Sequence, residues 1–180
     1  LELCLAREGL PGRALWAFAE TRQTSRVRQA LGLEPIRGAW SRYAEALWVE
    51  RGASPVAREA LAGERRGLEG ERLARAALEL LLWVEHLPAE QAAAWIGNHA
   101  GLADEDARRA VLLASGRPGF AAATVALWAL QDLRAELERE MGPRFRLDAF
   151  HDAVLRSGAI PTAQLRAEVR AALLAPPKKR

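Results

Sequence analysis

The stretch that decides the fold class is EGERLARAALELLLWVEH, residues 69–86. Its apolar residues recur at steps of three and four, as Leu73, Ala77, Leu80 and Val84 show. This spacing places apolar side chains along one face of an α-helix and is typical of a helix that packs in a core. We therefore expect this segment to form the central core helix of the protein.

The rest of the sequence favours helices as well. Ala, Leu, Arg and Glu, which are good helix formers, dominate the 180 residues, whereas the strand formers Ile and Thr are scarce. No run of residues alternates apolar and polar side chains with the period of two that a strand requires. The sequence therefore predicts an all-α fold, a single helical bundle of about nine helices with short connections.

Capping and helix-breaking residues set the expected boundaries. Ser, Asp and Pro favour helix starts, and Gly and Pro favour helix ends. No long linker separates the helices, so we expect one domain over residues 1–175, followed by a basic tail at residues 176–180. After a first turn or two that ends at Gly9, the expected helices lie over residues 11–32, 35–52, 54–63, 69–86, 88–97, 104–116, 118–141, 148–158 and 161–175.

The excess of basic residues is confined to the C-terminus. The chain has 26 Lys and Arg against 23 Asp and Glu, and three of the basic residues are Lys178, Lys179 and Arg180. A nucleic-acid interface would need a basic stripe on the folded body to neutralise phosphates. The body instead intersperses Arg and Glu at helical spacing, which indicates a solvated, ion-paired helical surface. We expect no nucleic-acid partner.

Cysteine content and hydropathy limit which cellular localisation is expected for the protein. The single cysteine, Cys4, cannot form an internal disulfide and is expected to be a small buried apolar residue, so cytoplasmic localisation is the default expectation. The longest apolar stretch, residues 120–130, is about half the length of a membrane span, and we expect no membrane partner. No secretory signal opens the chain, and Leu1 stands where Met would start a protein, so we expect a fragment or a processed product.

Motifs for catalysis are absent from the sequence. None of the three histidines, at 86, 99 and 151, is followed by the Glu of a zinc-peptidase helix, and no two lie close together in sequence. Neither a nucleophile elbow nor a phosphate-binding loop occurs. The six tryptophans fall on expected helices and are attributed to the core, although Trp40 and Tyr43 could line a groove for a peptide.

His151 has two interpretations. It lies three residues after Asp148 and four before Leu155, between the polar and apolar faces of its expected helix. In the structural interpretation, Asp148 or a backbone carbonyl orients the ring. In the functional interpretation, His151 is a hydrogen-bond donor that faces a cleft.

The stretch MGPRFRLDAFHDAVLRSGAIP, residues 141–161, resembles the C-terminal signature of a bacterial family, the domain of unknown function numbered 885. Members of that family look like helical zinc metallopeptidases. The family pattern runs Gly-x-x-Phe-x-Leu-x-x-Phe-His, then Leu or Val followed by Leu, and then Gly-x-x-Pro. This is a specific match.

Four shorter segments resemble the family in the same order. WSRYAE at 40–45 resembles the second part of its Glu-Gly-Trp-Ala-x-Tyr-x-Glu motif, and EQA at 90–92 resembles the start of one of its helices. PG at 118–119 resembles its Pro-Gly-Gln-Ala segment, and LELCLA at 1–6 resembles the residues directly after its His-Glu-x-x-x-x-His-His zinc segment. The resemblance covers nearly the whole chain and corresponds to the C-terminal third or so of a full-length member.

The zinc ligands of the family are not matched. Its histidines would precede Leu1, and its ligand Glu falls at Gly38 or Ala39, neither of which can bind a metal. The resemblance therefore implies no metal site and no cofactor in this chain, with zinc bound only if an upstream half is present and intact.

Further departures fall at polar positions of the family. Its Gln after Pro-Gly falls at Phe120, and a nearby Tyr falls at Thr124. The acid and the histidine of its core helix fall at Glu79 and Trp83, so only the acid is retained. Apolar groups thus stand where polar groups would polarise a scissile carbonyl, which suggests a helical scaffold whose active site has decayed.

The leading hypothesis is a non-catalytic helical scaffold or binding domain derived from a metallopeptidase-like family. Its expected partners are an N-terminal half of the same protein, a peptide-like ligand, or a second copy of the chain. One alternative is the C-terminal portion of a zinc-dependent peptidase whose metal motif lies upstream, and another is a generic helical adaptor. The expected binding residues are Trp40, Tyr43, Glu45, Phe120 and His151.

Overall fold

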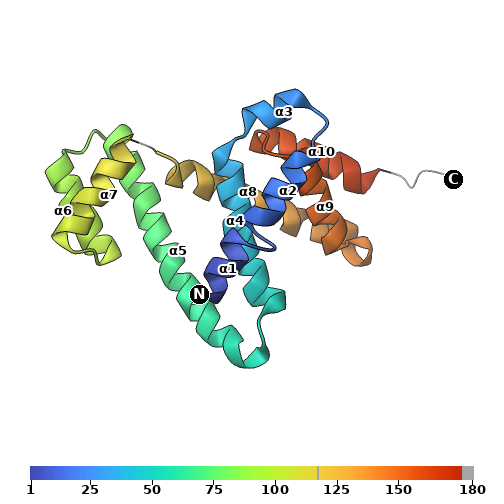
Figure 1. Cartoon of the computed structure of the whole chain (residues 1–180), viewed down its shortest axis with the longest axis horizontal. Coiled ribbons are helices and arrows are strands. Elements are labelled where there is room, and N and C mark those ends of the chain that lie inside the picture. Colours follow the sequence, from blue (N-terminus) through green and yellow to red (C-terminus); the bar gives the residue numbers. More distant parts are fainter. Residues whose placement is uncertain (117, 176–180) are drawn as a thin grey trace. The chain divides into compact units, whose positions relative to one another are not determined.

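The computed structural model describes residues 1–116 and 118–175, so the expected basic tail at 176–180 lies outside the described residues. The described residues form ten α-helices and no strand, which confirms the all-α prediction (Figure 1). They group into two compact units, one formed by residues 1–45 and 126–175 and the other by residues 46–116 and 118–125. The single domain over residues 1–175 therefore stays a prediction.

The first unit is built from helices of both chain ends. Its core gathers aromatic and aliphatic side chains from these helices, among them Trp16, Trp40, Leu133, Phe150 and Val154. Its elements are α1 (Glu2–Glu8), α2 (Arg13–Thr21), α3 (Arg26–Leu31), most of α4 (Glu34–Leu47), the later part of α8 (Phe120–Met141), the 3-10 turn η2 (Gly142–Arg144), α9 (Leu147–Ser157) and α10 (Thr162–Leu174).

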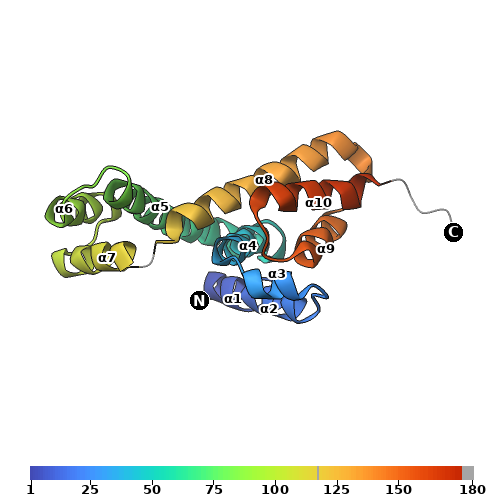
Figure 2. The same ribbon diagram turned by 90° about the horizontal axis from the view of Figure 1, so that it is seen from above.

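Ion pairs fasten α10 to its neighbours in this unit. Figure 2 shows α10 alongside α8, where Arg166 pairs with Glu136 and Arg170 pairs with Glu140. On α3, the Arg28 guanidinium donates from Nη1 and Nη2 to the two carboxylate oxygens of Glu168, each over 2.8 Å. This bidentate geometry is the strong form of an Arg–carboxylate contact.

The expected helix over residues 11–32 is two helices, α2 and α3. Ser25 interrupts it, because its side-chain oxygen accepts a hydrogen bond from the backbone N–H of Arg28 and caps α3. In the intervening turn, the Gln23 amide donates to the carbonyl of Arg156 over 2.6 Å. Local capping and a contact with the distant end of α9 thus outweigh continuation of the helix.

Residues next to its ends determine where the helix that carries His151 begins and ends. Arg146 occupies the N-cap position of α9, so the helix begins at Leu147 and not at Asp148, where the expected range 148–158 starts. The Asp148 carboxylate instead accepts hydrogen bonds from the Arg146 guanidinium, which lowers the pKa of Asp148. The helix ends before Gly158, whose φ of +76° lies in the region that favours glycine over other residues.

The second unit consists of one long helix and a helical hairpin. In Figure 1, α6 and α7 lie side by side next to the C-terminal end of α5. Their shared core consists mainly of small residues, Ala74, Leu78, Ala92, Ile96, Ala107, Ala110, Val111 and Ala114. The elements are the π-helical turn η1 (Trp48–Gly52), α5 (Pro55–Trp83), α6 (Ala89–Ala100), α7 (Asp104–Gly116) and the first residues of α8.

The segments expected as two helices over 54–63 and 69–86 form the single helix α5, 29 residues long. Ser54 caps its start, as the sequence predicts, by accepting a hydrogen bond from the backbone N–H of Ala57. The glycines at 63, 67 and 70 do not end the helix. A helical glycine costs about 1 kcal/mol relative to alanine, which a long packed helix tolerates, whereas an interior proline would have broken it.

The buried face of α5 differs from the predicted face. Ala74 and Leu78 enter the core, while Leu73, Leu80 and Val84 are 39%, 54% and 63% exposed. The apolar spacing of this segment admits both faces, because Leu occupies consecutive positions from 80 to 82. Packing against the α6–α7 hairpin selects the face with the smaller residues.

Two further expectations about burial are wrong. Cys4 is exposed rather than buried. Trp83 and Trp128 are 54% and 50% exposed, so only some of the six tryptophans are core residues. In the described part of the chain no single helix has the length and hydropathy of a membrane span, although the bent pair α7 and 120–144 passes both criteria together.

Leu78 and Leu80 of α5 provide a test of this packing. We expect Leu78→Ala to lower the free energy of unfolding by about 3 kcal/mol, because Leu78 is 1% exposed and its loss leaves a cavity. We expect Leu80→Ala, the same change on the exposed face, to lower it by less than about 1 kcal/mol. Urea unfolding followed by circular dichroism measures both. Equal losses would contradict the burial of the Leu78 face.

The Arg28–Glu168 pair predicts a pH dependence of stability. The hydrogen bonds from Arg28 hold the pKa of Glu168 below its ordinary value of 4.5. A carboxyl group with a lowered folded-state pKa stabilises the fold above its unfolded pKa and loses that contribution as the pH falls through the folded pKa. We expect Glu168→Gln to lower the free energy of unfolding by about 1 kcal/mol at pH 7, with the difference disappearing in the acid range below pH 4.5.

Urea titrations at several pH values measure this difference. The control is Glu59→Gln, an exposed carboxyl on α5 that has no ion pair with a described residue. A Glu168→Gln effect that is the same at all pH values would show that the pair acts through packing alone.

Candidate functional site

A hydrogen-bonded group of three side chains joins three helices of the first unit. Tyr43 on α4 lies with its hydroxyl oxygen 2.8 Å from Nε2 of His151 on α9. Arg134 on α8 donates from Nη1 to the same hydroxyl oxygen over 3.2 Å. Because the guanidinium donates to the phenolic oxygen, the hydroxyl hydrogen can be donated to Nε2 of a neutral imidazole. We call these three residues the Tyr43 cluster.

Aromatic rings enclose the imidazole of the Tyr43 cluster. Trp40 meets His151 edge-on, with ring centroids 5.7 Å apart, and Phe150 lies 5.8 Å away. The Trp40 indole N–H donates to the carbonyl of Pro11 over 2.9 Å, so the ring is held in one orientation. Trp40 and Tyr43 are 1% and 2% exposed, whereas His151 is partly exposed. Arg134 is partly exposed as well, so the imidazole and the guanidinium are the parts of the cluster that a ligand can reach.

Glu45 has a different role from that of Tyr43. It comes two residues after Tyr43 and is fully buried in the first unit. The Arg7 guanidinium on α1 forms an ion pair with its carboxylate over 3.3 Å. A buried carboxylate requires such a partner, so Glu45 ties α1 to α4.

The first unit brings together three of the five expected binding residues. Trp40, Tyr43 and His151 are in mutual contact, and their role in binding stays a prediction. The partner that orients His151 is Tyr43, and Asp148 pairs with Arg146 instead. Phe120 belongs to the second unit, so its role as a binding residue stays a prediction.

Arg134 and Arg7 are the residues that the sequence analysis missed. Arg134 has a sequence signal only as half of an exposed pair with Glu138, four residues later, and that pair is present over 2.8 Å. Nothing in the sequence places Arg134 near Tyr43, because 91 residues separate them.

Glu79 is the acid of the core helix that the family resemblance retains. Its carboxylate is 3% exposed and lies at the start of α8 within the second unit. Three backbone N–H groups donate to it over 2.8 to 2.9 Å, those of Gly119, Phe120 and Ala121. A carboxylate at a helix N-terminus satisfies unpaired N–H groups and interacts favourably with the helix dipole. Glu79 thus anchors α8 to α5.

The residues present do not fit the zinc site that the resemblance associates with the family. Among the described residues, no three His, Cys, Asp or Glu side chains are placed to hold a metal ion. Zinc requires three or four converging nitrogen, sulfur or oxygen ligands. Gly38 and Ala39 stand at the matched ligand position on α4 and offer no ligand side chain.

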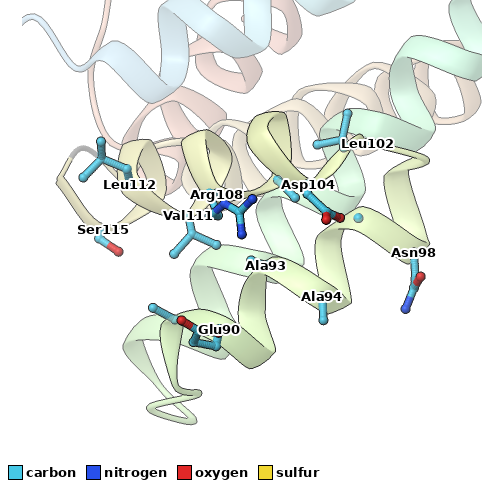
Figure 3. Close-up of a pocket in the computed structure, with 13 residues that line it drawn as sticks. Glu90, Ala93, Ala94, Asn98, Leu102, Asp104, Arg108, Val111, Leu112 and Ser115 are labelled. Carbon is cyan, nitrogen blue, oxygen red and sulfur yellow. The ribbon is translucent and has the colours of Figure 1, made fainter.

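A second candidate site is a pocket between α6 and α7 in the second unit (Figure 3). It has a volume of about 620 Å³, within the range of ligand-binding pockets. Figure 3 shows Glu90, Ala93 and Ala94 along α6, facing Asp104, Arg108 and Val111 on α7. None of the expected binding residues lies in this pocket, which sequence reasoning did not predict.

The sequence and the fold both have known relatives. The family model described as a bacterial protein of unknown function, DUF885, matches residues 1–169. A candidate lipoprotein of unknown function from Shewanella oneidensis is similar in structure, with a TM-score of 0.79 and 22% identity over 93% of this chain. A candidate lipoprotein from Colwellia psychrerythraea gives a TM-score of 0.85 and 24% identity over 96%. This chain spans 31% and 30% of those two chains. No curated protein matches the sequence.

The anchoring role of Glu79 predicts a large loss of stability on its removal. We expect Glu79→Ala to lower the free energy of unfolding by about 3 kcal/mol, because three backbone N–H groups at the start of α8 lose a charged acceptor. The matched control is Glu71→Ala, which removes an exposed carboxylate of α5 paired with Arg75, at a cost below about 1 kcal/mol. Urea unfolding measures both variants. A similar loss in both would contradict the anchoring role of Glu79.

Proposed function

The chain belongs to the bacterial DUF885 family of unknown function, and we propose that it is a non-catalytic helical scaffold or binding domain. The proposed ligand is peptide-like and contacts the Tyr43 cluster. The observation that carries the proposal is the Tyr43–His151 hydrogen bond, which holds a partly exposed imidazole in a fixed orientation.

The chemistry of the Tyr43 cluster supports a peptide-like ligand. An imidazole and a guanidinium offer N–H donors, which suit the carbonyl and carboxylate oxygens of a peptide. The rings of Trp40 and Phe150 around His151 supply apolar contact area beside these polar groups. Specific ligand sites commonly combine an apolar lining with a few placed polar groups.

The proposed partners include an N-terminal portion of the same protein. The chain spans about a third of each of the two structures that share its fold, so a partner of larger size is available in those proteins. Exposed apolar side chains of α1 and α2, such as Leu5 at 60% and Phe18 at 52%, support burial against a partner or a second copy.

Nuclear magnetic resonance tests the ligand proposal. The probe is the neutral peptide acetyl-trialanine amide, titrated into the chain while the ring signals of its three histidines are followed. We expect saturable shifts of the His151 signals, with those of His86 and His99 unchanged, because His151 alone belongs to the Tyr43 cluster. We expect Tyr43→Phe to weaken binding about fivefold, since it releases the imidazole from its hydrogen-bond partner.

The control variant is Trp128→Phe, a conservative change at an exposed position outside the Tyr43 cluster. It should leave the titration unchanged. Absence of saturable shifts at His151 would contradict the ligand proposal. Cleavage of the peptide by the chain in the presence of zinc would contradict the non-catalytic role.

The second candidate function is the C-terminal portion of a zinc-dependent peptidase whose metal motif lies upstream. This candidate is favoured because the chain spans only about a third of the length of each similar structure. The Tyr43 cluster supports it as well, because a phenol and an imidazole can polarise a carbonyl. This candidate requires a His-Glu zinc motif in the adjoining upstream sequence, so reading that sequence tests it directly.

A further inference from the structure

The groove between α6 and α7 has small side chains along α6 and an exposed apolar side chain at its edge on α7. On α6, Ala89, Ala93 and Gly97 recur at steps of four and leave little side-chain volume along the groove. On α7, Leu112 lines the same groove and is 73% exposed. Small residues on one side and an exposed leucine on the other allow a further helix to approach closely.

Three charged side chains lie in order along this groove. Figure 3 shows the Arg108 side chain projecting between the two helices, with Asp104 on one side and Glu90 on the other. The hairpin is antiparallel, and a Cβ atom at Gly97 would lie 3.7 Å from that of Ala107, which sets the register. Asp104 is one turn, about 6 Å, before Arg108, and Glu90 lies about 9 Å beyond it. The charges therefore alternate as negative, positive and negative.

These three charges are available to a partner. Glu90, Asp104 and Arg108 are exposed, and none of them forms an ion pair or a side-chain hydrogen bond with another described residue. Asp104 and Arg108 are spaced to pair on one helix, yet they lie too far apart to do so in this structure. Three unpaired charges in alternating order, next to an exposed apolar side chain, indicate that a partner with complementary charges binds here. They do not form ion pairs within the described part of the chain.

We propose that the groove between α6 and α7 docks an amphipathic helix whose charges are complementary to those of Glu90, Arg108 and Asp104. Such a helix carries a basic residue, an acidic residue about four positions along and a second basic residue six or seven positions further. These positions share one face of the helix, next to apolar residues that contact Leu112 and Val111. The docked helix adds a fourth member to the α5–α6–α7 unit.

The shape of the groove favours a helix over a small ligand. The pocket follows the hairpin along most of both helices, from Ala89 to Asn98 and from Asp104 to Ser115. Its lining alternates apolar and charged groups instead of converging on one point. Amphipathic helices bind such grooves through an apolar stripe, with flanking charges that set orientation.

Two synthetic peptides test the proposal. Both are fluorescein-labelled alanine–leucine helices; one carries Lys, Glu and Lys at the stated spacing, and the other carries Glu, Lys and Glu. Fluorescence anisotropy at low ionic strength measures their binding to the chain. We expect the first peptide to bind about tenfold more tightly than the second. Its three charges form exposed ion pairs with the three charged side chains of the groove, whereas the charges of the second peptide are repelled by them.

Charge reversal in the chain provides the decisive comparison. We expect Arg108→Glu to weaken the first peptide about fivefold and to strengthen the second. Arg109→Glu makes the same change on the neighbouring residue, which does not line the groove, and should leave both affinities unchanged. Ala93→Trp should abolish binding of both peptides by filling the groove.

Circular dichroism verifies that each variant is folded. The two charge variants change exposed side chains and leave the core residues unaltered. Equal binding of the two peptides, absence of binding, or equal effects of Arg108→Glu and Arg109→Glu would overturn the proposal. A dimer of the chain that Arg108→Glu abolishes in sedimentation equilibrium would also overturn it, in favour of a second copy.

Discussion

The hydroxyl group of Tyr43 is the contact on which the first unit depends. It accepts a hydrogen bond from Arg134 and lies 2.8 Å from His151, so one oxygen atom connects α4, α8 and α9. Because the group is buried, each of its hydrogen bonds replaces one that water would otherwise make. The orientation of the imidazole, and hence any ligand contact at this site, depends on that arrangement.

The second unit is organised around a buried carboxylate and a set of small side chains. Glu79 satisfies the N–H groups at the start of α8, and Ala and Gly residues allow α6 and α7 to pack closely against α5. Close packing of small residues buries little area per residue and leaves larger apolar side chains, such as Leu80 and Leu112, at the surface. Exposed leucines beside a groove are therefore a consequence of how this core is built.

Membership of the DUF885 family and the similarity to two larger proteins give this fold a context. The residues that match the family pattern around His151 form part of a hydrogen-bonded site in the first unit. The acid that matches in the core helix, Glu79, is engaged by backbone N–H groups and has a structural role. A match in sequence thus corresponds to a candidate binding site in one place and to helix capping in the other.

The sequence by itself determined the helical class and those helix ends that depend on neighbouring residues. Ser54 caps α5, α7 begins at Asp104, and Gly158 comes directly after α9, because caps and breakers act through backbone groups a few residues away. Only the tertiary structure decided which face of α5 is buried and which partners Tyr43 and Glu79 have. Those contacts join residues that are 40 to 108 positions apart, and apolar spacing alone does not encode which of two apolar helix faces meets a neighbour.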